Sequence, residues 1–388
     1  MDEALPLRGI RVFELCSVAA GPFCGMLLAD LGADVIKVEN PRGGDTMRQW
    51  PPLTNGYSEN FASLNRNKRS VTLDLKVPSD RSRASRLLST ADVVLENNRP
   101  GVMARLGLDY PSLKARNRGL IYCSISAFGQ EGPRATEGGF DVTVQAISGV
   151  MSVTGEPEGA PVKCGVPVSD FSAGLYAALA ITATLHQRRE TGEGAYIDVS
   201  MLGASLGIAA LQTSEYFGTG RNPRKLASAH PRNAPYQAFR ARDGHFVLAA
   251  GNDNLWELAC KAIRREDLCG DPQFATTATR AANQDALRQI LEAEFAQFDC
   301  KALIERFTGA GVPCAPINGY ADALSDPQVQ FMGWVQELEL PDGSLTRTFG
   351  SPVRLSGRSV PIGRRPPALG EHNDEVFAEL DQASTGPS

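Results

Sequence analysis

The chain has 388 residues, a net charge of −5, 42% apolar residues and 21% charged residues. This length predicts two or three domains, and the composition is ordinary for a soluble enzyme with a large core. The mild negative charge argues against a nucleic-acid-binding surface, and no apolar run approaches the roughly 20 residues that span a membrane.

The cysteines and histidines bear on whether the protein holds disulfides or a metal ion. The eight cysteines are scattered and form no CxxC pair, and no two of the four histidines have metal-ligand spacing. The N-terminus starts acidic and lacks the charged and apolar regions of a signal peptide. We therefore expect reduced thiols, a cytoplasmic location and no metal site.

Strands and helices alternate over the first 200 residues. An apolar run over 9–15, a helical pattern over 22–32 and a second apolar run over 34–39 form one βαβ unit. This unit predicts an α/β domain with a parallel sheet. Further strands are expected over 71–75, 93–97, 120–126 and 195–200. Further helices are expected over 78–90, 110–116, 140–150 and 171–189.

The pattern changes in the second half of the chain. Residues 214–234 are polar and broken by Gly and Pro, which predicts a linker. Hairpins are expected over 236–250 and 335–349, because each run has an Asp-Gly pair at its centre. Helices are expected over 253–265, 283–296 and 300–309, and a short helix within 364–380.

These elements predict two domains joined by two linkers. A large α/β domain is expected over 1–200 and is completed by the returning stretch 345–388. A smaller α+β domain is expected over 226–325. The linkers are then residues 201–225 and 326–344.

The loop after the first strand, CSVAAGPFCG at 16–25, lacks the GxGxxG fingerprint of dinucleotide-binding proteins. Glu39 ends the second strand, as a ribose-binding acid would, but it gives little support without the glycines. The start of the following helix still favours an anion such as a phosphate. Basic residues cluster near the ends of several expected strands, and for any one of them an ordinary solvated surface charge is favoured over a phosphate ligand. They are Arg42, Lys68, Arg69, Arg99 and Arg105.

The pentapeptide GASLG at 203–207 matches the GxSxG nucleophile elbow of α/β-hydrolases. Ser205 would be the nucleophile, and Asp253 and His372 follow it in the chain order of that triad. Gly, Ala and Ser are also common where helices pack closely. A packed helix start is therefore favoured over a serine hydrolase.

Asp170 lies in GVPVSDFSAGLYAALA (165–180), between a strand-like run and a helical run. The residue type and position suit a helix N-cap, whose carboxylate accepts a backbone N–H. The small residues that follow would also leave room for a bulky ligand beside a nucleophilic carboxylate. For Asp170 considered alone the helix cap is favoured, and the residues permit a catalytic carboxylate without demanding one.

Several segments together resemble the class III CoA-transferases, the family of formyl-CoA transferase, carnitine CoA-transferase and α-methylacyl-CoA racemase. Within that family the chain looks most like enzymes that pass CoA between dicarboxylic acids, of the succinyl-CoA:glutarate type. The matching segments span nearly the whole chain in family order. They are 9–45, 65–76, 91–113, 120–133, 138–155, 165–180 and 366–376.

The resemblance implies a role for each matching position. Asp170 falls on the family's catalytic aspartate, which carries a mixed anhydride and then an aspartyl-CoA thioester. Asp141 matches an acidic position next to the active site. Asn40 stands where formyl-CoA transferase has a CoA-binding arginine, so Arg42 becomes a candidate substitute. The other implied CoA contacts are Val18, Ala20, Leu73, Asn97 and Arg105.

The resemblance also implies the partners and the assembly. Acyl-CoA and a carboxylic acid are substrates, with succinyl-CoA the preferred donor and no permanently bound cofactor. The fold implied is a Rossmann-like parallel-sheet domain with a smaller α+β domain, in an interlaced, ring-like homodimer. No nucleic acid and no membrane is expected as a partner.

Two departures from the family pattern bear on the reaction. The racemases have a histidine directly before the acid at the position of Asp141, but this chain has Phe140 there. A racemase is therefore only the alternative. The tetraglycine loop of formyl-CoA transferase is also missing. The segment 225–236 is expected to line the acceptor pocket instead, with His230, Arg232 or both pairing with a distal carboxylate.

Overall fold

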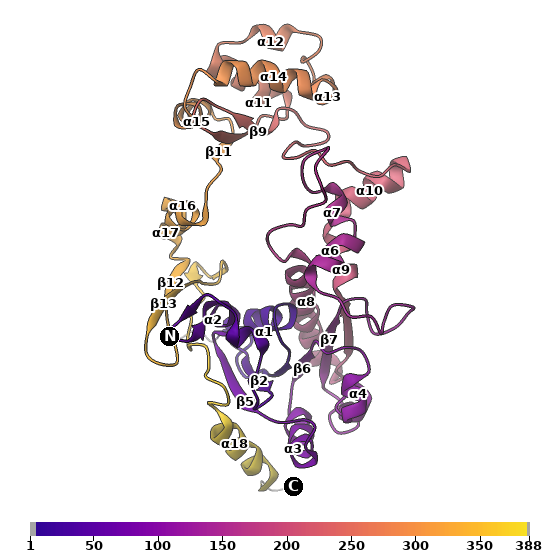
Figure 1. The fold of residues 1–388 in the computed structure, drawn as a ribbon. Helices are drawn as coiled ribbons and strands as arrows, with labels where there is room; N and C mark the ends of the chain where they lie inside the picture. The colour runs from indigo at the N-terminus through magenta and orange to yellow at the C-terminus, as the bar shows by residue number, and fades with distance from the viewer. Residues whose placement is uncertain (1–4, 386–388) are drawn as a thin grey trace. The chain divides into compact units, whose positions relative to one another are not determined.

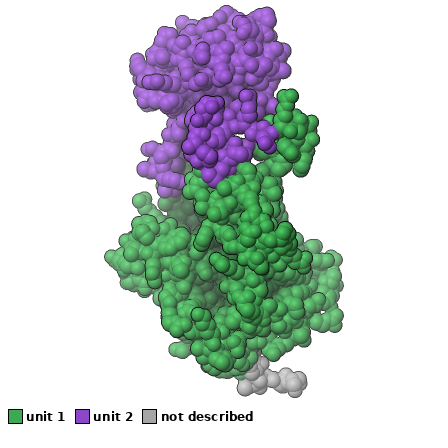
Figure 2. All heavy atoms as spheres, turned by 45° about the vertical axis from the view of Figure 1, so that its right-hand side comes forward, with its two compact units in different colours: residues 1–150, 163–221, 328–388 green, residues 151–162, 222–327 purple. Residues whose placement is uncertain are grey.

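The computed structural model describes residues 5–385 and divides into two compact units. Unit 1 comprises residues 1–150, 163–221 and 328–388, and unit 2 comprises residues 151–162 and 222–327 (Figure 2). The chain thus leaves the first unit, builds the second, and returns.

Unit 1 is built on a six-stranded, wholly parallel sheet (Figure 1). Its order is β5-β2-β1-β6-β7-β8, so the winding direction reverses between β1 and β6. This is the doubly wound Rossmann order, and it confirms the predicted α/β class. The strands are β1 (Arg11–Leu15), β2 (Asp34–Glu39), β5 (Lys68–Thr72), β6 (Val93–Glu96), β7 (Ile121–Ser126) and β8 (Tyr196–Ser200).

Alternating side chains of the strands build two cores, one on each face of the sheet. Val12 and Val35 pack on one face, and their neighbours Phe13 and Ile36 pack on the other. This alternation follows from the two-residue period of a strand. The first face is covered by α1 (Ala20–Asp30), α8 (Val168–Thr191) and α9 (Met201–Ile208). The second is covered by α3 (Pro78–Ser89), α5 (Tyr110–Lys114) and α18 (Asn373–Thr385).

The remaining elements of unit 1 are short and lie around this sandwich. The helices are η1 (Thr46–Gln49), α2 (Glu59–Asn65), α4 (Val102–Leu106), α6 (Asp141–Ile147) and α10 (Ala210–Thr219). Three antiparallel hairpins are β3 (Leu53–Thr54) with β4 (Tyr57–Ser58), β12 (Val335–Glu339) with β13 (Leu345–Phe349), and β14 (Arg354–Leu355) with β15 (Arg358–Ser359). The hairpin predicted over 335–349 is confirmed.

Unit 2 has its own aromatic core. β9 (Tyr236–Arg240) and β10 (His245–Ala249) form the predicted hairpin, and β11 (Cys314–Pro316) pairs antiparallel with β10. The rings of Phe246, Phe295 and Phe307 contact one another, with centroids 5.3–6.1 Å apart; Phe295 meets the other two edge-on. The larger helices are α11 (Asp253–Ile263), α14 (Gln284–Phe295) and α15 (Cys300–Gly309). Shorter ones are α12 (Asp267–Gly270), α13 (Thr277–Ala282) and α16 (Tyr320–Ser325); α7 (Val150–Val153) and α17 (Pro327–Met332) lie where the chain passes between units.

The polar run predicted as a linker over 214–234 is wrong over its first part, because α10 continues to Thr219. Gly220 ends that helix with φ 67°, a left-handed conformation that glycine adopts at little cost. The break therefore falls at this glycine, and the residues before it keep helical hydrogen bonds despite their polarity.

Helix α8 is long and apolar enough, by length and composition alone, to cross a membrane. One such helix is weak evidence for a membrane protein. Ala173, Ala177, Ile181 and Leu185 of α8 are buried in the first core, between the sheet and the neighbouring helices. We interpret α8 as the central core helix of unit 1.

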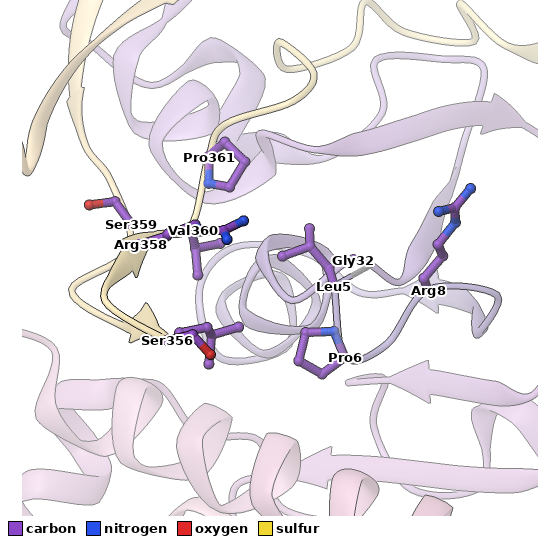
Figure 3. A pocket seen from close by; sticks show the side chains of 10 residues that line it. Leu5, Pro6, Arg8, Gly32, Ser356, Arg358, Ser359, Val360 and Pro361 are labelled. Carbon is purple, nitrogen blue, oxygen red and sulfur yellow. The ribbon is translucent and has the colours of Figure 1, made fainter. Parts of the chain in front are cut away.

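Unit 1 also has a cavity of about 640 Å³ between its N-terminal segment and the β14–β15 hairpin (Figure 3). Leu5, Pro6 and Arg8 lie on one side of it, and Ser356 and residues 358–361 line the other. None of the site residues predicted from the sequence lines this cavity. The residues predicted for the site therefore lie elsewhere in the structure.

Candidate active site

Asp170 is the third residue of α8, whose N-cap position is taken by Pro167. The predicted N-cap role of Asp170 is therefore wrong: the helix begins three residues earlier than expected, at Val168. Proline at the cap position explains this, because its fixed φ suits the start of a helix. Within the described residues, no hydrogen-bond donor contacts the Asp170 carboxylate.

Asp141, at the start of α6, binds the backbone directly before Asp170. Its Oδ1 accepts a hydrogen bond from the Ser169 amide at 3.0 Å, and its Oδ2 accepts one from Gln145 Nε2 at 2.7 Å. Gln145 is fully buried, and its Oε1 accepts the Cys164 amide at 2.8 Å. The side chains of Asp141 and Gln145 therefore fix the segment that leads into α8.

The surroundings raise the pKa of Asp170 to about 7. Burial is the larger cause, because it disfavours the charged carboxylate, and the nearby negative charge of Asp141 adds to it. The first turn of a helix acts in the opposite sense and favours an anion. Asp170 is thus a half-buried carboxylate without hydrogen bonds in the described part of the chain, and a pKa raised in this way marks it as a candidate functional residue.

Ser205 does not form a nucleophile elbow. It lies inside α9 and is fully buried, with its Oγ 2.8 Å from the Met201 carbonyl oxygen and 2.8 Å from Ser169 Oγ. The proposed triad partners are engaged elsewhere: Asp253 accepts a hydrogen bond from Arg280, and His372 Nδ1 accepts one from the Ser70 amide. The serine-hydrolase alternative is therefore wrong, because its hydroxyl is in a helix interior.

The loop after β1 approaches the start of α8 through the packing of α1 on α8. A Cβ on Gly174 would lie 2.8 Å from the Ala20 carbonyl oxygen, so only glycine lets the two helices come this close. The rings of Phe23 and Phe171 meet with centroids 4.6 Å apart. The loop and Asp170 therefore belong to one region of unit 1.

Asn97 and Asp45 hold this loop. Asn97 follows β6, and its side chain accepts a hydrogen bond from the Ser17 amide at 3.0 Å and donates one to the Ser17 carbonyl at 2.8 Å. Asp45 accepts the Val18 amide at 3.1 and 3.2 Å. The contact between Ser17 and Asn97 spans the point between β1 and β6 where the winding reverses, the usual place for a ligand in such a sheet.

The other predicted CoA contacts lie at the same carboxyl edge of the sheet. Ala20 begins α1, Leu73 directly follows β5 and is buried, and Arg42 follows β2. Arg42 pairs with Asp74 at 2.8 Å and is largely exposed. Arg105 is exposed in the last turn of α4.

The structure reveals a group of buried charges: the sequence interpretation missed Glu14 and Lys37, and the solvated surface charge favoured for Lys68 is wrong, because that side chain is buried. Glu14, Lys37 and Lys68 are fully buried at the bottom of the loop after β1. Lys37 Nζ and Lys68 Nζ each lie 2.8 Å from one carboxylate oxygen of Glu14. A signal was present, because Glu14 and Lys37 interrupt the apolar strands RVFEL and DVIKVE, where a charge needs a buried partner.

His230 and Arg232 belong to unit 2 and are described within it. His230 Nδ1 accepts the amides of Arg232 at 3.2 Å and Asn233 at 3.1 Å, so this nitrogen has a structural role. Partial burial and the charge of Arg232 lower the pKa of His230, which disfavours the charged form of the ring. Of the two, Arg232 is the better candidate to offer a positive charge to a substrate.

Phe140 is 74% exposed and directly precedes Asp141. Its ring cannot accept or donate a proton, so this position has no base of the kind a racemase needs. Among residues 5–385, no group of three or more His, Cys, Asp or Glu side chains is arranged to hold a metal ion. The arrangement favours chemistry at one carboxylate, Asp170.

Comparison with known proteins gives the family of this chain. The family model described as CoA-transferase family III matches residues 7–373. A succinate–glutarate CoA-transferase of Agrobacterium fabrum is 42% identical, over 97% of this chain and 96% of the relative. A succinyl-CoA:mesaconate CoA-transferase of Haloarcula hispanica is 37% identical, over 98% of this chain and 97% of the relative.

A solved structure gives the same result for the fold. A CaiB/BaiF family protein from Brucella suis superposes with a TM-score of 0.87 at 40% identity. The match covers 98% of this chain and 100% of that structure. With its family match over almost the whole length, this chain belongs to CoA-transferase family III and is an enzyme of the CoA-transferase class.

Proposed function

We propose that this enzyme transfers CoA from succinyl-CoA to a dicarboxylic acid and that Asp170 is its nucleophile. The names of the relatives support the substrates, since they pair succinate or succinyl-CoA with glutarate or mesaconate, both dicarboxylic acids. The observation that carries the proposal is the Asp170 carboxylate itself. It is half-buried, lacks hydrogen bonds in the described part of the chain, and has a raised pKa.

The first half of the reaction loads CoA onto the enzyme. A carboxylate oxygen of Asp170 attacks the thioester carbonyl, the carbon–sulfur bond breaks, and CoA leaves as a thiolate. This forms a mixed anhydride between Asp170 and the succinyl group. The thiolate then attacks the aspartyl carbonyl, which releases succinate and leaves an Asp170–CoA thioester.

The second half repeats these steps in reverse. The acceptor carboxylate attacks the Asp170–CoA thioester, forming a new anhydride and releasing CoA thiolate. The thiolate attacks the acceptor carbonyl, giving the acceptor-CoA product and a free Asp170 carboxylate. A carboxylate suits this task because an anhydride and a thioester both keep the acyl group activated, whereas a seryl ester would not.

Backbone amides near Asp170 are the expected donors to the oxyanions that form at each step. The amides of Ser169 and Phe171 are already bonded, to Asp141 and to the Pro167 carbonyl. The amides of Ala19, Ala20 and Gly21 make no hydrogen bond within the described residues. We infer that these amides at the start of α1 take part in binding acyl-CoA.

The covalent intermediate can be tested directly. After incubation with succinyl-CoA and no acceptor, mass spectrometry should find a CoA adduct on the peptide that contains Asp170. The adduct should be absent from Asp170→Ala and should disappear when glutarate is added. A wild-type protein that transfers CoA without such an adduct would contradict the covalent route.

Arg232 is proposed to bind the distal carboxylate of the acceptor, because a guanidinium binds a carboxylate with two parallel hydrogen bonds. Arg232→Ala should raise the acceptor KM for glutarate by about tenfold or more, with little change in the KM for succinyl-CoA. Arg224→Ala, another exposed arginine of unit 2, is the matched control. Equal effects on both substrates would contradict this role.

We also propose that the protein is a homodimer. Unit 1 presents apolar side chains to solvent from α8 and α10, which is the composition of an interface rather than of a free surface. They include Leu175 at 54%, Leu179 at 65%, Leu211 at 62% and Phe217 at 82% exposure. Sedimentation equilibrium should give twice the chain mass of 41.5 kDa, and a monomer at micromolar concentration would contradict the proposal.

A further inference from the structure

Val18 has an unusual backbone conformation in the loop that precedes α1. Its φ is 68°, in the left-handed region. For a β-branched residue this conformation is a genuine outlier, since Cβ approaches its own carbonyl oxygen. Such a residue keeps this conformation only when its surroundings hold it there.

Asp45 is what holds it. Its Oδ1 lies 3.1 Å from the Val18 amide and also accepts the Met47 amide at 3.0 Å. Its Oδ2 lies 3.2 Å from the Val18 amide and 3.0 Å from Lys37 Nζ. The side chain is fully buried, so no water competes with these donors. Both carboxylate oxygens therefore face only donors, as an ionised aspartate requires.

Two buried lysines fix the ends of the same loop. Lys37 Nζ donates to the Cys16 carbonyl at 2.8 Å, and Lys68 Nζ donates to the Pro22 carbonyl at 2.8 Å. The Glu14 carboxylate forms ion pairs with both ammonium groups. Two carboxylates and two lysines thus meet beside a loop of five residues, 17–21.

We propose that Asp45 is a positioning residue for acyl-CoA binding, which holds Val18 left-handed so that the amides of residues 19–21 stay unpaired for the substrate. The inference rests on the proposed function, because it takes the loop beside Asp170 to be the CoA-binding loop. Asp45 touches neither substrate nor Asp170 in this account. It acts through the backbone of Val18.

The first test is the affinity for CoA, measured by titration calorimetry on the full-length protein. Asp45→Asn should weaken CoA binding by about tenfold, because either placement of the new amide group sets its N–H donors against other donors. Asp45→Ser is the second variant. Serine can still cap η1 at the Met47 amide but is too short to span the distance to Val18 as well, so the same loss is expected.

Asp30→Asn is the matched control. Asp30 is equally buried at the far end of α1, where it pairs with Arg66 at 2.7 Å. The Asp30→Asn variant should lose about as much thermal stability as Asp45→Asn. Its CoA affinity should stay within about twofold of wild type, since Asp30 does not touch the loop. If Asp30→Asn weakens CoA binding as much as Asp45→Asn does, the effect is one of general stability and the inference is overturned.

The second test separates a positioning role from a structural one. Glycine adopts a positive φ without strain, so Val18→Gly removes the need to hold residue 18. The factor by which Asp45→Asn weakens CoA binding should fall from about tenfold to about threefold in the Val18→Gly background. An unchanged factor in both backgrounds overturns the inference.

The two proposals fail in different ways. If wild-type protein binds CoA and forms the Asp170 adduct, while Asp45→Asn and Asp45→Ser bind CoA normally, the role of Asp45 is disproved and the transferase proposal stands. If wild-type protein binds CoA but no adduct forms, the covalent route fails and the role of Asp45 is still decided by the affinities. If wild-type protein binds no CoA, both are overturned.

Discussion

Replacing Asp170 by asparagine should reduce CoA transfer at least about a thousandfold while making the folded protein more stable above pH 7. The activity falls because an amide oxygen cannot form the anhydride. Ser205→Ala is the control for activity, since that buried hydroxyl has no part in the reaction, and it should keep transfer within a few-fold. Transfer that survives Asp170→Asn but is lost in Ser205→Ala would sink the assignment.

The gain in stability depends on pH with a definite sign. Asp170 has a pKa of about 7 when folded, against about 3.9 in an unfolded chain. The folded state therefore keeps the proton longer, and its stability falls as the pH rises from about 4 to 7. The full difference corresponds to about 4 kcal/mol, which solvent access to this partly exposed carboxylate reduces to about 1–2 kcal/mol.

Asparagine cannot ionise and escapes this loss. The melting temperature of Asp170→Asn should therefore exceed that of wild type by a few degrees near pH 8, and the two should converge near pH 4. Differential scanning calorimetry across this range measures the difference. A gain that is the same at both ends of the range would mean that the charge of Asp170 is not its source.

The second large effect is expected at Lys37. Lys37→Met keeps the volume of the side chain but leaves Asp45 buried without its cation and Glu14 with Lys68 alone. Removing one partner of a buried ion pair typically costs about 3–5 kcal/mol. Burial alone would lower the pKa of Lys37, but Glu14 and Asp45 more than offset it and raise that pKa above its ordinary value, so the lysine is charged.

Urea unfolding followed by circular dichroism measures this loss. Arg242→Met is the comparison, because its ion pair with Asp299 lies in solvent and should leave the unfolding midpoint unchanged. Adding Asp45→Asn to Lys37→Met should recover part of the stability, since it removes the unpaired carboxylate. If Lys37→Met is no more harmful than Arg242→Met, the buried group contributes little to folding.

Local sequence patterns were enough to predict much of this fold. The strands over 34–39 and 93–97 appear within one residue of their predicted ends, and the helix over 300–309 has its predicted bounds. These elements were predictable because hydrophobic periodicity and the residues that end an element are local signals. The start of α8 was misplaced, because the run before Asp170 is apolar and looks extended. The structure instead begins the helix right after Pro167.

The site was only partly predictable for a different reason. The catalytic role of Asp170 and the choice of Asp141 came from a family resemblance, and the order of the two residues in the chain does not predict the hydrogen bond from the Ser169 amide to Asp141. The contact of Asp45 with Val18 joins residues 27 positions apart. It also requires a conformation that valine avoids, so no local propensity points to it.

The position of α18 has a consequence for how the protein is made. Arg69 of the edge strand β5 is 4% exposed and pairs with Glu375 and Glu379, while Val376 completes the core on that face. A ribosome adding about 5–20 residues per second needs roughly ten to thirty seconds to synthesise the chain beyond residue 221. Until then the edge strand and Arg69 lack the helix that covers them in the folded protein, so this face of the nascent chain stays exposed to solvent.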